Sequence, residues 1–168
     1  MNIDISKYPV RRSKPIVFGS YGLPEDTERY IVKAQGLICI DLYQGDTIEI
    51  NNLEGNQICE ITIFDFKGNN KQEIINKKPE IENSFLKNVL TNSTDKKYLL
   101  EKLKKKNIQI NNSYSSLIFN KDTKRNDVEK ILINEDCSAI FACPGEKMLV
   151  SNQNPPTDIE LIVKRINP

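Results

Sequence analysis

The chain contains no histidine in its 168 residues. Histidine is the side chain whose charge changes nearest neutral pH, so acid–base or metal chemistry here must come from carboxylates, amides, thiols, tyrosines or lysines. A seryl nucleophile is excluded as well, because Ser113, Ser115 and Ser116 have neither a glycine elbow nor a histidine base.

Other familiar signals are also missing. The sequence has no phosphate-binding loop, no dinucleotide fingerprint and no CxxC pair, and no apolar run approaches the roughly 20 residues of a membrane helix. The N-terminal residues lack the apolar stretch of a secretory signal. A formal net charge of +1 gives no general attraction to nucleic acid. We therefore expect a cytoplasmic domain that binds neither membranes nor nucleic acid.

Short β segments dominate what is present. The pattern predicts strands at 28–34, 37–43, 46–51 and 57–66, and again at 116–119, 129–133, 137–142, 147–150 and 159–166. Tight polar connections between the first four favour an antiparallel meander or barrel. The expected fold class is mainly β with a helical insertion (α+β), an antiparallel β-barrel or sandwich-like domain.

The length suits one domain. Residues 1–27 are rich in proline and glycine and predict a surface arm, and residues 28–168 form the domain itself. Helical spacing of apolar residues places an insertion at 79–107. Its second helix is capped by Thr94 or Asp95, with Tyr98, Leu99 and Leu103 on the inner face.

The segment from Leu53 to Asp65 is rich in side chains that can bind a ligand or exchange a proton: amides, a thiol and carboxylates. Gly55 is the expected site of a positive φ in a turn that presents the amides of Asn56 and Gln57. Alternation along the following strand puts Cys59, Ile61 and Ile63 on one face and Glu60, Thr62 and Phe64 on the other. Both faces are largely apolar, which predicts a central strand buried on two sides. In that setting the Glu60 carboxyl group must find a partner or shift toward its neutral form. This set suits a small nitrogenous ligand bound by Asn56, Gln57 and Asp65, with Glu60 as the catalytic group. The alternative is a hairpin turn whose buried glutamine fixes the loop backbone.

Three cysteines offer a metal site if their strands are neighbours. Thiolates of Cys59, Cys137 and Cys143 can hold zinc and leave one position open for water. Each lies in an apolar run, however, where a free cysteine also behaves as a small core residue. Both interpretations stay open from the sequence.

The motif G-D-x-I-x-I-x-N-L-E-G-N-Q-I-C-E, from Gly45 to Glu60, resembles the pattern of the urea-carboxylase-associated domain family. The run from Ala142 to Ile166 looks like the closing strands of the version that precedes glycine-cleavage T-protein-like folate domains. Gly55, Gln57 and Glu60 match the motif. Asn52 departs from it, since the family usually has aspartate there, and the histidine segment of many members has no counterpart.

The resemblance implies a mostly β, barrel-like fold and a link to the breakdown of small nitrogen compounds. A similar domain occurs in trimethylamine N-oxide demethylase, where cysteines hold zinc and a following folate domain receives formaldehyde. Because the sequence ends at Pro168, we expect tetrahydrofolate only through a separate T-protein-like (aminomethyltransferase) partner.

Two hypotheses follow from the sequence. In the first, the chain is an accessory or catalytic subunit in methylated-amine or guanidine-related and one-carbon metabolism, assembled as an oligomer beside that partner. In the second, it is a non-catalytic β-barrel assembly or binding module that has lost the family's chemistry. The missing histidine and the asparagine at position 52 favour the second.

Overall fold

The computed structural model describes residues 23–81, 85–87, 96–108, 110, 113–145 and 155–166. The strands found there are β1 (Thr27–Val32), β2 (Leu37–Leu42), β3 (Thr47–Asn52), β4 (Cys59–Asp65), β5 (Ser116–Phe119), β6 (Asp127–Leu132), β7 (Cys137–Ala142) and β8 (Ile159–Lys164). A 3-10 turn, η2 (Gln72–Ile75), and a helix, α2 (Lys96–Lys105), lie between β4 and β5.

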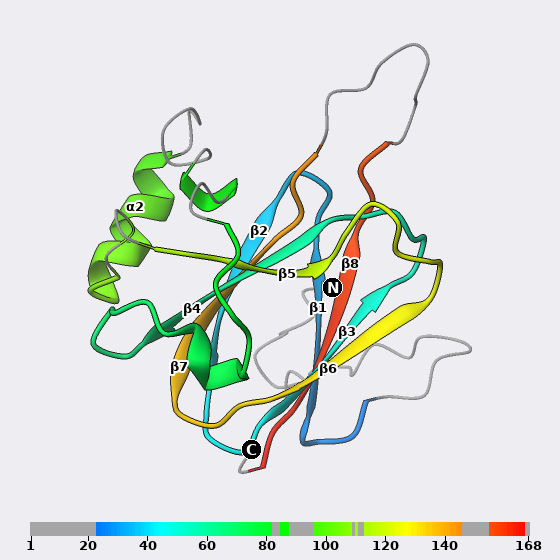
Figure 1. Cartoon of the computed structure of the whole chain (residues 1–168). Helices are drawn as coiled ribbons and strands as arrows, with labels where there is room; N and C mark the ends of the chain where they lie inside the picture. The colour runs from blue at the N-terminus through cyan, green and yellow to red at the C-terminus, as the bar shows by residue number, and fades with distance from the viewer. Residues whose placement is uncertain are drawn as a thin grey trace, which may run out of the picture.

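The strands form two antiparallel sheets that face each other (Figure 1). One sheet has the order β1-β8-β3-β6 and the other β2-β7-β4-β5. Their inner faces enclose the main core, to which Ile48, Ile61 and Leu161 contribute fully buried side chains. The expectation of a mainly β, sandwich-like domain with a helical insertion is therefore confirmed, and the closed barrel is not observed.

The predicted meander is wrong in its pairing. Consecutive strands β1, β2, β3 and β4 alternate between the two sheets, so their tight turns cross the sandwich and do not form hairpins. The β1 strand pairs instead with β8, joining Thr27 to Lys164. Turn residues predict where a strand ends, but they do not say whether the next strand pairs with it or crosses to the other layer.

Strand β4 is central in its sheet and buried on both faces, as its apolar pattern predicted. Cys59, Ile61 and Ile63 face the core between the sheets. Phe64 faces the other way and packs with Leu86 and other residues of a second cluster, under the helical insertion. Figure 1 shows α2 on this outer side of the β2-β7-β4-β5 sheet.

Helix α2 lies within the range predicted for the insertion, and its Leu103 is buried as expected. The helix ends in a Schellman motif. Asn107 adopts a left-handed φ of 55°. The N–H of Ile108 donates to the carbonyl of Leu103 at 3.0 Å, and both side chains lie in the second cluster. This cap fixes the end of the helix against the sheet.

Several sequence predictions lie outside the described residues: the surface arm over most of its range (residues 1–22), the helix cap at Thr94 or Asp95 and the strand at 147–150. The side chains of Tyr98 and Leu99, predicted for the inner face of the helix, are also outside the described part of the chain. Within the described ranges, the helices are too short or too polar to span a bilayer.

Candidate functional site

Glu60 is the second residue of β4, on the outer face of its sheet. It lies between Leu117 of β5 and Ala142 of β7, and only 7% of it is exposed. Its Oε2 accepts a hydrogen bond of 2.8 Å from the backbone N–H of Phe85. Burial raises the pKa of Glu60, and the Phe85 N–H offsets part of that rise. The carboxyl group therefore holds a proton more readily than a surface glutamate does.

Hydroxyl groups lie beside Glu60 on the same face. Thr62 is two residues further along β4, about 7 Å away by strand geometry. Its Oγ1 shares a hydrogen bond of 2.7 Å with the Oγ of Ser115, and both residues are buried. A carboxyl group next to paired hydroxyls can orient a small polar molecule and exchange a proton with it.

The side-chain amide of Gln72 lies beside β4 and joins it to the segment before β5. Its Nε2 donates to the carbonyls of Ile61 and Tyr114 at 2.9 and 2.8 Å. Its Oε1 is buried and has no hydrogen-bond partner among the described residues. Sequence reasoning missed Gln72, and it considered Ser115 only as an excluded nucleophile, because only long-range folding brings these two residues to β4. Thr62 was predicted on the Glu60 face by strand alternation.

The turn before β4 has a structural role. Gly55 has a φ of 80°, which confirms the predicted positive value. A Cβ there would lie 2.7 Å from the backbone nitrogen of Arg125. The Oδ1 of Asn52 accepts from the Gly55 N–H at 2.9 Å, while its Nδ2 donates to the carbonyl of Gln57 at 3.0 Å. An aspartate can accept the first bond but cannot donate the second, so the asparagine suits this turn.

Gln57 links three segments of the chain. Its Nε2 donates to the carbonyls of Ile58 and Pro144 at 2.7 and 3.1 Å, and its Oε1 accepts from the Thr157 N–H at 2.7 Å. Asn56 is exposed with a φ of 57°, and its N–H donates to the carbonyl of Thr123. The buried glutamine therefore fixes loop backbone, while Asn56 presents its side chain at the surface.

Replacing Gln57 with leucine tests this role. We expect the free energy of unfolding to fall by about 2 kcal/mol, because the Thr157 N–H and the Pro144 carbonyl lose a buried partner. Urea titration measures the change, and the exposed Gln44→Leu serves as the control, expected within about 0.5 kcal/mol of wild type. A Gln57→Leu variant as stable as wild type would mean that the amide is not needed for the fold.

Asp65 lies at the far end of β4 from Asn56 and Gln57. Its Oδ1 accepts from the N–H groups of Lys67 and Asn69 at 3.0 and 2.9 Å. The side chain thus stabilises its own turn. The structure does not bring it together with the two amides that the sequence grouped with it.

The three candidate zinc ligands do not meet. Cys59 and Cys143 are adjacent and buried in the core, and the Cys143 thiol together with burial holds the pKa of Cys59 well above its usual range. Cys137 begins β7 at the opposite end, beside Asp65, and burial raises its pKa to about 12. The described residues contain no group of three potential metal ligands. These thiols therefore do not fit a three-cysteine zinc centre, because the length of β7 separates them.

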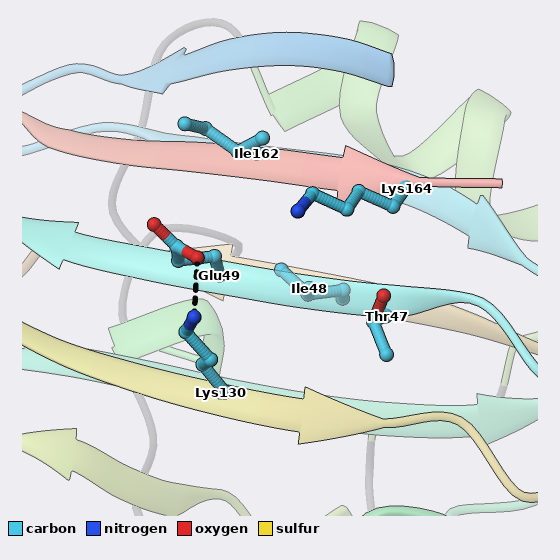
Figure 2. A pocket seen from close by; sticks show the side chains of 6 residues that line it. All are labelled: Thr47, Ile48, Glu49, Lys130, Ile162 and Lys164. Atoms are coloured by element: carbon cyan, nitrogen blue, oxygen red, sulfur yellow. Dashed lines mark ion pairs between the residues drawn. The ribbon is translucent and has the colours of Figure 1, made fainter. Parts of the chain in front are cut away.

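Surface hollows among the described residues lie elsewhere. One, of about 200 Å³, lies on the outer face of the β1-β8-β3-β6 sheet, where Ile162 and Lys164 flank an ion pair of 3.0 Å between Lys130 and Glu49 (Figure 2). Another lies beside Tyr43. Neither contains a residue predicted as a site from the sequence.

Fold and site define a two-layer β-sandwich with a buried, protonatable carboxyl group beneath a helical insertion. The sequence is 28% identical over 146 residues to trimethylamine-oxide aldolase from Ruegeria pomeroyi. That similarity covers 86% of this chain but only 18% of the relative, so the chain spans less than a fifth of the aldolase. No protein-family model matches the sequence. The expected similarity to an enzyme acting on trimethylamine N-oxide is therefore found, whereas membership of the urea-carboxylase-associated family remains a prediction.

Proposed function

We propose that this chain acts on a small methylated amine compound, with Glu60 as the group that exchanges protons with it. The similarity to trimethylamine-oxide aldolase supports the substrate class. The observation that carries the proposal is the buried Glu60 carboxyl group, whose pKa is raised by burial and which accepts a hydrogen bond from the Phe85 N–H. A carboxyl group tuned in this way can serve as both acid and base.

The conversion of trimethylamine N-oxide to dimethylamine and formaldehyde needs no external oxidant. Trimethylamine N-oxide contains the atoms of dimethylamine and formaldehyde together: the N–O bond and one methyl C–H bond break, a C–O bond forms, and the C–N bond then breaks. In its neutral form Glu60 can donate a hydrogen bond to the N-oxide oxygen. As a carboxylate it can accept the methyl proton and return it to the leaving nitrogen. The hydroxyls of Thr62 and Ser115 can orient the substrate beside it.

The released formaldehyde is reactive, which favours a tetrahydrofolate-dependent, T-protein-like partner in an oligomeric assembly. The test is an NMR assay of the purified chain with trimethylamine N-oxide, alone and with a T-protein-like enzyme and tetrahydrofolate. We expect dimethylamine and formaldehyde in equal amounts from the chain alone, and loss of free formaldehyde when the partner is added. Absence of dimethylamine under both conditions would contradict the proposal.

The second candidate is a non-catalytic assembly module. It is favoured by the turn before β4, where Asn52, Gly55 and Gln57 use their hydrogen-bonding groups within the chain. Native co-purification separates the two candidates. A stoichiometric enzyme partner, combined with no activity in the small chain, would support the module.

A further inference from the structure

Two aromatic side chains are exposed next to each other at the end of the sandwich. Tyr43 follows β2 and is 52% exposed, and Phe66 follows β4 and is 47% exposed. Their rings meet edge to face, with centroids 6.0 Å apart and an interplanar angle of 77°. Exposed neighbouring rings leave apolar surface in water unless a partner or ligand covers it.

A hollow of about 330 Å³ opens beside Tyr43, near the lower bound of the volumes typical of small-molecule sites. Besides Tyr43 its lining consists of Gln44, Asp46, Asp136 and Ile166. In Figure 1 the turn between β2 and β3 lies next to the C-terminal end of β8. Phe66 and Glu60 lie toward opposite ends of β4, so this hollow is separate from the Glu60 site.

The charges around the hollow favour a cation. Arg165 lies over the Tyr43 ring at 6.0 Å, but its guanidinium is bound by two carboxylates, Glu28 at 2.6 Å and Asp46 at 2.7 Å. That pairing leaves it unsuited to hold an anion. Asp136 is exposed, and its Oδ1 accepts a hydrogen bond from the Gln44 N–H. Among these residues, three carboxylates (Glu28, Asp46 and Asp136) therefore stand against the one guanidinium of Arg165.

We propose that this end of the sandwich is a binding site for a small alkylammonium cation, held against the Tyr43 ring beside Asp136. An aromatic face attracts a weakly hydrated organic cation through its quadrupole, and the nearby carboxylate supplies the opposite charge. A hollow lined by an isoleucine and a tyrosine also suits alkyl groups better than a strongly hydrated metal ion. The inference goes beyond the proposed function and stands without it, because it concerns binding and no turnover.

The test is a titration of the ¹⁵N-labelled chain with tetramethylammonium chloride, followed by NMR at constant ionic strength. We expect saturable shifts at the amides of Tyr43, Gln44 and Phe66. Neopentyl alcohol, a neutral molecule of similar shape, should shift them little. Equal shifts from the alcohol, or no saturable shift from the cation, would overturn the proposal.

Variants make the test specific. Tyr43→Leu is expected to weaken binding about fivefold, in keeping with a partly exposed cation–π contact. Asp136→Asn keeps the acceptor for Gln44 and should weaken binding about threefold at low salt. The control is Tyr114→Leu, which removes another exposed tyrosine and should leave the affinity unchanged. Unchanged affinity in Tyr43→Leu and in a second variant, Phe66→Leu, would also overturn the proposal.

Discussion

Glu60→Gln is expected to lower turnover of trimethylamine N-oxide by about 10²-fold or more, the contribution typical of a positioned acid or base. Glutamine has nearly the same shape, and its amide oxygen can still accept the hydrogen bond from the Phe85 N–H. The variant therefore loses the proton while keeping the packing. Dimethylamine release measured by NMR gives the rate.

Stability separates a chemical role of Glu60 from a structural one. Burial raises the pKa of Glu60, so the protonated carboxyl group is compatible with the folded state and the carboxylate destabilises it. The stabilisation from the protonated group is fully present below the unfolded pKa of about 4.5, and it is lost as pH rises through the pKa of the folded state. At pH 7 we expect Glu60→Gln to melt at or above the wild-type temperature. The difference in melting temperature between the two proteins should narrow at acidic pH.

The matched control is Glu49→Gln, which neutralises a glutamate on the other sheet, paired with Lys130. It should retain wild-type turnover. An inactive Glu60→Gln variant that also melts far below wild type would instead mean that Glu60 is needed for folding and not for catalysis.

Gly68→Ala is expected to lower the free energy of unfolding by about 3 kcal/mol or more, among the larger effects of single substitutions. Gly68 has a φ of 89°, and a Cβ there would lie 1.8 Å from the carbonyl oxygen of Asn107, in the cap of α2. That atom belongs to the backbone, so relief requires the insertion to move away from the sheet. Chemical denaturation measures the loss.

Gly145→Ala is the control for this substitution. Its φ is not in the left-handed range, and the three atoms nearest to an added Cβ all belong to the side chain of Gln35, with no backbone atom among them. We expect a change within about 1 kcal/mol. If Gly68→Ala were equally mild, the end of α2 would not pack on the turn after β4.

The features of the fold that the sequence predicted were local ones. Alternation in β4 correctly separated Ile61, which faces the core, from Phe64, which faces the insertion. The glycine at position 55 correctly indicated a positive φ. Strand pairing was not predictable, because the choice between a hairpin and a crossing to the other sheet depends on packing between distant segments. The pairing of Thr27 with Lys164 illustrates this.

The candidate site was predicted only in part, because its contacts also depend on packing between distant segments. An isolated carboxyl group in an apolar strand pointed to Glu60, but no local pattern shows that Phe85 supplies its hydrogen bond. The strand predicted at 137–142 already implied that its length separates Cys137 from Cys143, so the three-cysteine site could have been excluded from the sequence. Gln57 was correctly placed near the start of β4, and its three partners identify it as a structural residue.

The central claim is that Glu60 exchanges protons with a methylated amine substrate. The most direct measurement is a single NMR time course of trimethylamine N-oxide with the wild-type chain and with Glu60→Gln side by side. We predict equal amounts of dimethylamine and formaldehyde from the wild type, and at least about 10²-fold less from the variant. Equal rates in the two proteins, or no product from either, would contradict the claim.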